Sequence, residues 1–204
     1  MPVLHELAMS LAQQQAQARR SLRLNQLTHG PYAQLSGLVD RHAPFSSTEH
    51  FSRLVAAQYL LQRDLEPVYQ STQLIRLLPD LPQRCRLEQA ALDLRDLRQP
   101  LPQADDSIRL RQMDTGEALA WLFVSEAAKR KAATWLQRAP ELGLNERFGA
   151  RHLVEPDGGC AQSWQRFISA LDAAPLDPEQ ERRVDVAALA ACARITEHLN
   201  RCFA

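Results

Sequence analysis

Apolar side chains recur along most of the chain at intervals of three and four residues. Leu4, Leu7 and Leu11 show this spacing near the start, and Leu24 and Leu27 show it further on. Such spacing gathers apolar side chains on one face of a helix, which has about 3.6 residues per turn. Glycine is scarce, with 7 residues, whereas Leu, Ala, Gln, Arg and Glu, which favour helices, are abundant. The pattern predicts an all-α protein.

Proline-rich and polar segments divide this pattern into separate helices. We expect helices over about residues 3–19, 21–40, 48–69, 71–78, 83–97, 115–139, 160–173 and 178–202. No internal repeat or low-complexity tract divides the chain further. The sequence therefore predicts one domain over residues 1–204, with residues 1–19 as an N-terminal helical extension.

Local signals mark several of the expected helix ends. Ser47 and the pair Asp177-Pro178 are typical starts, because a side-chain oxygen can accept from the first free backbone N–H groups. Thr115 is expected to cap the segment 115–139, which we predict as the longest uninterrupted helix. Gly30-Pro31 is expected to disturb the second helix and Pro67 to end or kink the third, because proline lacks a backbone donor.

Composition and charge exclude several classes of protein. Lys+Arg and Asp+Glu both number 24, and this zero formal charge argues against a nucleic-acid partner. No apolar run approaches the roughly 20 residues of a spanning helix, and the first residues lack the pattern of a signal peptide, so we expect a cytoplasmic protein without a membrane partner. The four cysteines are widely spaced, which predicts free thiols and neither a zinc site nor a disulfide framework: Cys85, Cys160, Cys192 and Cys202.

Four ordered segments resemble one known family. They read RLNQLTHGPYAQLSGLV, APFSSTEHFSRLVAAQYLLQRDLEPVY, EALAWLFVSEAAKRKAA and LNERFGARHLVEPDGG followed by WQRF. Together they resemble the bacterial biliverdin-producing heme oxygenases, especially the pseudomonad type, over roughly residues 20–203.

The resemblance implies a single all-α domain with heme between a proximal helix, about residues 21–40, and a distal helix, about residues 115–138. Members of this family bind heme and open its ring with oxygen and a partner's electrons, giving biliverdin, carbon monoxide and iron. The resemblance therefore implies heme or a bilin as ligand and, if the protein is active, an electron-donor reductase as partner.

The proximal segment departs from the family at the iron ligand. The family places a histidine four residues after a threonine; here the threonine is Thr28 and the fourth residue on is Tyr32. His29 lies three residues earlier, which on a helix is about 60° of rotation and about 4.5 Å along the axis. His29 therefore cannot replace the ligand without a shift of the helix or the heme, which Gly30-Pro31 could permit.

The distal segment departs as well, because the resemblance implies glycines that let heme and oxygen approach the backbone. Their positions fall at about Ala120, Ala127 and Lys131. A methyl group at Ala127 narrows the space, and Lys131 adds a long cationic side chain. A family lysine that anchors heme propionates falls near Asp40, a reversal that Arg41 or Arg138 could offset.

Each candidate has a structural alternative. Tyr32 is either an oxygen ligand to heme iron or an aromatic residue filling the space of heme, and His29 is either an axial ligand or an exposed helix residue. Phe123 either touches the ligand or belongs to the core, and Lys131 and Arg138 are either site residues or ordinary surface cations. No catalytic residue is predicted, since no paired carboxylates or nucleophile–histidine arrangement is present.

Three functions remain open from the sequence. The first is a heme-oxygenase-like protein with weakened or altered heme or tetrapyrrole binding and little ring opening. The second is an active heme oxygenase whose axial ligand is Tyr32 or His29. The third is a helical interaction protein without a cofactor. Heme is thus an expected ligand that could also be absent or replaced by another tetrapyrrole.

Overall fold

The computed structural model describes residues 20–103, 113–156 and 158–204. Within these ranges the chain is helical, and its only β-type pairings are isolated bridges at Asn145. The all-α prediction is confirmed, while the helix expected over residues 3–19 lies outside the described residues. None of the described helices is long and apolar enough to cross a bilayer.

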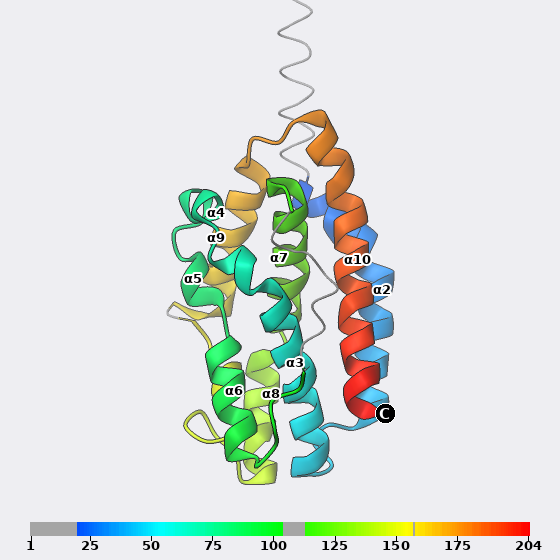
Figure 1. The fold of residues 1–204 in the computed structure, drawn as a ribbon, viewed down its shortest axis with the longest axis vertical. Coiled ribbons are helices and arrows are strands. Elements are labelled where there is room, and N and C mark those ends of the chain that lie inside the picture. The colour runs from blue at the N-terminus through cyan, green and yellow to red at the C-terminus, as the bar shows by residue number, and fades with distance from the viewer. Residues whose placement is uncertain (1–19, 104–112, 157) are drawn as a thin grey trace, which may run out of the picture.

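The helices follow one another along the chain as Figure 1 shows. Their bounds are α2 Arg20–His42, α3 Thr48–Tyr69, α4 Thr72–Leu77, α5 Leu81–Arg84, α6 Leu87–Asp96, α7 Thr115–Lys129, α8 Ala132–Arg138, η2 Ala139–Leu142, η3 Arg151–Leu153, α9 Gly159–Ala173 and α10 Pro178–Phe203.

The C-terminal helix α10 organises the fold, because it packs against α7, α3 and α2 (Figure 1). Its fully buried face contains small residues such as Ala188 and Ala191, which allow neighbouring helices to approach closely. Against this face pack Leu119 of α7 and Leu65 of α3, which belong to the same core cluster. The proximal and distal segments, more than 70 residues apart in the chain, are thereby held in one bundle.

The predicted caps are largely confirmed. The Ser47 hydroxyl accepts from the backbone N–H of His50, and the Asp177 carboxylate accepts from the N–H groups of Glu179 and Gln180. The cap of α7 is Asp114 rather than Thr115. The Asp114 carboxylate accepts from the N–H of Glu117, and the Glu117 carboxylate accepts from the N–H of Asp114, which together form a capping box.

Two expectations about helix continuity are wrong. The helix expected over 115–139 is interrupted between Lys129 and Ala132, where the N–H of Arg130 bonds the carbonyl of Ala127 three residues back and so tightens the last turn of α7. The helix expected over 83–97 is divided at Cys85, which takes an extended conformation. Helix α2 is a single helix through Gly30 and Pro31, whereas α3 ends at Tyr69, two residues after Pro67, close to the expected end.

Candidate functional site

An apolar cleft of about 130 Å³ lies between α2 on one side and the α7–α8 junction on the other. Helices α3 and α10 complete its walls. Its aliphatic lining consists of Leu35, Val39, Leu54, Ala57, Leu61, Ile195 and Leu199. This is the place where the family resemblance implies heme.

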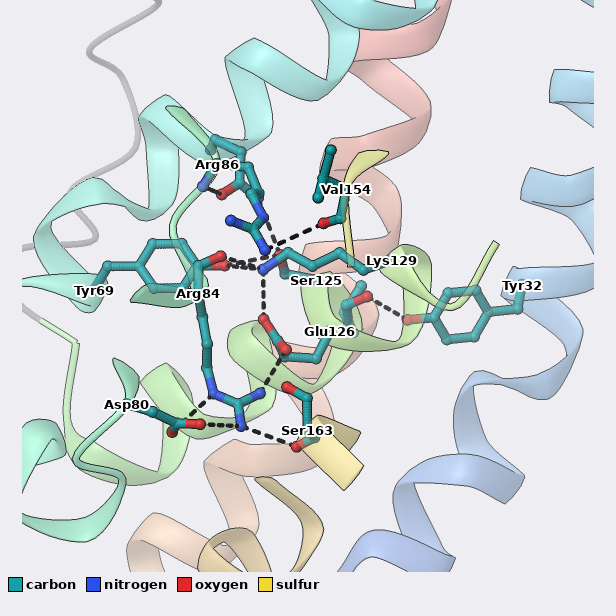
Figure 2. Close-up of polar contacts among 12 residues, drawn as sticks. Tyr32, Tyr69, Asp80, Arg84, Arg86, Ser125, Glu126, Lys129, Val154 and Ser163 are labelled. Atoms are coloured by element: carbon teal, nitrogen blue, oxygen red, sulfur yellow. Dashed lines mark hydrogen bonds and ion pairs between the residues drawn. The ribbon is translucent and has the colours of Figure 1, made fainter. Parts of the chain in front are cut away.

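Tyr32 enters this cleft from the middle of α2. One turn earlier, the buried Thr28 hydroxyl donates to the carbonyl oxygen of Leu24 at 2.7 Å, so its hydrogen bond stays within α2. Tyr32 instead reaches across and donates its phenol hydrogen to the carbonyl oxygen of Val124 on α7, at 2.6 Å (Figure 2). Burial raises the pKa of Tyr32 well above its usual value, so the phenol is neutral at physiological pH.

The α7–α8 junction closes the cleft from the opposite side. Ala127, Ala128 and Lys131 line it there. The Lys131 ammonium donates to the hydroxyl of Ser36 on α2 at 2.5 Å, at the exposed mouth of the cleft. The structure therefore brings Tyr32, Ala127 and Lys131 together, as a site between these helices requires.

The other predicted site residues lie elsewhere. His29 is exposed and does not line the cleft. Phe123 is fully buried and packs on the Trp164 ring with centroids 5.5 Å apart, on the α9 side of α7. Arg138 is exposed at the end of α8, where its guanidinium lies 4.2 Å from the centroid of the Phe45 ring and pairs with Glu141.

The polar network beside α7 was not found from the sequence (Figure 2). Arg84 donates to the Glu126 carboxylate at 2.7 Å and to the Asp80 carboxylate at 3.0 and 3.1 Å. Lys129 donates to Glu126 at 2.5 Å and to the hydroxyl of Tyr69 at 3.1 Å. The only local signal for this network in the sequence is the spacing of three between Glu126 and Lys129 on one helix.

Two charges in this network are hidden from solvent. The side chains of Arg84 and Glu126 are 3% and 7% exposed. Burial opposes the charge on Lys129, but Glu126 and Tyr69 together outweigh burial and raise the Lys129 pKa above its usual value. Figure 2 shows Tyr69 and Tyr32 approaching α7 from different directions, so the charged network and the apolar cleft are separate features of one helix.

The four cysteines are free thiols. Burial raises the pKa of Cys192, which lies on α10, to about 11, so that thiol stays protonated. Among the described residues, no three His, Cys, Asp or Glu side chains are arranged to hold a metal ion.

Comparisons with known proteins agree on one family. The family model for heme oxygenase matches residues 19–200. Heme oxygenase PigA of Pseudomonas aeruginosa is 48% identical over 185 residues, which cover 91% of this chain and 93% of that protein. The NO- and CO-bound heme oxygenase structure from Neisseria meningitidis superimposes with a TM-score of 0.83 at 26% identity, covering 90% of this chain and 92% of that one. The chain belongs to the heme oxygenase family.

Proposed function

We propose that this family member has weakened or altered heme and tetrapyrrole binding, and little of the family's ring-opening activity. The observation that carries this proposal is the hydrogen bond at 2.6 Å from Tyr32, which lines the cleft, to the Val124 carbonyl of α7. The side chain at the family's ligand position is thereby engaged with the opposite helix, and it lies in the space that heme would occupy.

The size of the cleft supports the same conclusion. Pockets for small organic ligands have volumes of roughly 300 to 1,000 Å³, and this cleft has about 130 Å³. Ala127 and Lys131 account for part of the difference, because both stand where the family resemblance implies glycine. Heme does not fit the cleft in this geometry without separation of α2 from the α7–α8 junction.

The chemistry of the lining points the same way. Tyr32 could bind iron only as a phenolate, and burial raises its pKa well above the usual value. It would also have to give up its bond to Val124. A phenolate is a hard anionic ligand that stabilises ferric iron, which opposes the ferrous state needed for oxygen binding. No ring-opening step follows from this arrangement.

One alternative is an active heme oxygenase in which heme separates the helices and Tyr32 becomes the axial ligand. The position of Tyr32 in the cleft favours it over His29, which is exposed. Such an enzyme would need an electron-donor reductase as partner. The other alternative is a helical interaction protein without a cofactor, which the narrow cleft favours.

Hemin titration distinguishes these functions. We expect the wild-type protein to give no tight one-to-one complex, whereas Tyr32→His combined with Ala127→Gly and Lys131→Gly should restore one. The reason is that the triple variant supplies an imidazole and removes two side chains from the cleft. The measurement is the Soret band, followed by aerobic turnover with ascorbate and the appearance of bilin absorption.

Tyr32→Phe is the matched control, because it keeps the ring and removes only the oxygen. A tight wild-type complex that turns over to a bilin and is lost in Tyr32→Phe would establish the active enzyme with an oxygen ligand. Failure of both the wild-type protein and the triple variant to bind hemin would favour the interaction protein.

A further inference from the structure

The outer face of α10 carries apolar side chains that remain exposed in the described chain. Val186 and Leu189 are 69% and 41% exposed, and Ala190 and Ala193 beside them are exposed as well. Their spacings of three and four residues bring them together on one side of the helix. Contiguous exposed apolar surface is typical of a contact with another protein.

This face points away from the apolar cleft. Helix α10 runs along the bundle (Figure 1) and contributes Ile195 and Leu199 to the cleft. Ile195 follows Val186 by nine residues, which is about two and a half turns, so the two side chains leave the helix on opposite sides. A protein bound to the outer face of α10 would therefore leave the cleft free.

Charged side chains flank the exposed apolar residues with opposite signs at the two ends. Arg182 lies about two turns before Ala190, and Glu197 lies about two turns after it. One turn further out, Glu179 precedes Arg182 and Arg201 follows Glu197. All four charged residues are exposed. Such a face is complementary to a second copy of itself that runs in the opposite direction.

These charges are available to a second protein. Arg182 forms no ion pair with any described residue, unlike the adjacent Arg183. Glu197 pairs with Arg194, but the Glu197 side chain is 64% exposed. Arg201 donates to a backbone carbonyl and to no carboxylate of the described chain. New ion pairs can therefore form at these positions without disrupting the bundle.

From these features we propose that the protein forms a symmetric dimer in which two copies of α10 pack antiparallel through their outer faces. A two-fold axis beside Ala190 sets Val186 against Ala193 of the partner subunit and Arg182 against Glu197 of the partner subunit. Each such contact occurs twice, as two-fold symmetry requires. One helix face per subunit is small beside the roughly 1,200 to 2,000 Å² of stable complexes, so the dimer is weak. This inference goes beyond the proposed function and does not depend on heme binding.

Sedimentation equilibrium of the full chain measures this self-association. We expect the average mass to rise from 23.0 kDa towards that of a dimer as the concentration increases from about 1 μM to about 1 mM. Ala190→Glu should abolish the rise, because it brings two like charges together at the two-fold axis. Ala161→Glu is the matched control, since it makes the same change at an exposed position of α9 and should leave self-association unchanged.

Two charge reversals test the antiparallel arrangement. Arg182→Glu and Glu197→Arg should each weaken self-association about tenfold or more, because each variant sets like charges against each other in its own dimer. An equimolar mixture of the two variants should associate again, since every flanking contact between them then joins opposite charges. Circular dichroism checks that each variant is folded.

Four outcomes would overturn the inference. The first is a mass of 23.0 kDa at every concentration, and the second is self-association that survives Ala190→Glu. The third is a mixture of Arg182→Glu and Glu197→Arg that does not associate. The fourth is dimerisation that appears only after removal of residues 1–19, which would mean that this segment occupies the outer face of α10 in the full chain.

Discussion

Glu126 lies between two cations that come from different parts of the chain. Arg84 approaches from α5 and Lys129 follows one turn later on α7. A buried ion pair is stabilising only relative to the broken pair, since each charge has lost its water. At the scale of single residues, the network beside α7 is thus a place where a substitution has a large electrostatic cost.

Glu126→Ala should lower the free energy of unfolding by about 3 to 5 kcal/mol, because it leaves the buried Arg84 charge with less compensation. Urea denaturation followed by circular dichroism measures this. Glu141→Ala is the control: its partner Arg138 is 49% exposed, and an exposed pair contributes about 0 to 1 kcal/mol. If both substitutions lowered the free energy of unfolding equally, burial would not explain the cost of breaking the Glu126 pair.

Among the helices, α7 determines the geometry of the cleft. It begins where Gly116 approaches α10 so closely that a methyl group added to this glycine would lie 2.9 Å from the Gln180 carbonyl oxygen. It ends at Lys129, before the tight turn that directs α8 along the cleft. Hydrophobic spacing does not reveal the turn at the end of α7, which is why the sequence predicts an unbroken helix over 115–139.

Gly116→Ala should destabilise the protein although alanine favours helices by about 1 kcal/mol over glycine. The added methyl group would force apart α7 and the backbone of α10. Gly37→Ala, inside α2, meets nothing closer than 3.5 Å and should raise the free energy of unfolding by about 0.5 to 1 kcal/mol. Thermal unfolding of both variants measures the difference. A higher melting temperature in both variants would contradict the close approach of Gly116 to the backbone of α10.

For the whole molecule, Asp64 joins α3 to α10 across most of the chain length. Its carboxylate accepts from His198 at 2.7 Å and from Arg194 at 2.8 Å. Burial alone would raise the pKa of Asp64, but these hydrogen bonds and charges outweigh it and lower the pKa. Asp64 therefore stabilises the folded state when it is ionised.

The stabilisation by Asp64 should depend on pH. Because its pKa is lower in the folded state, the contribution is complete above the unfolded value of about 3.9 and is lost as the pH falls through the folded value. Asp64→Asn should be less stable than the wild-type protein at pH 7, with the difference shrinking below pH ~4. Denaturation at several pH values measures this; a difference independent of pH would exclude ionisation of Asp64 as the cause.

The sequence alone determined the fold class and most helices, because these follow from hydrophobic spacing, helix propensity and caps such as Ser47 and Asp177. The family came from the resemblance of four ordered segments to known heme oxygenases. The sequence also predicted that Tyr32, Ala127 and Lys131 belong to a single site, and all three line the same cleft. Each of these signals is local or depends on an ordered set of segments.

Only the tertiary structure decided how these residues meet. The bond from Tyr32 to Val124 joins positions 92 residues apart, and the bond from Lys131 to Ser36 joins positions 95 apart. The tertiary structure also showed that Phe123 lies in the core and Arg138 at the surface. The physical reason is that the rotation and spacing of packed helices, and hence the width of the cleft, depend on side chains distant in sequence.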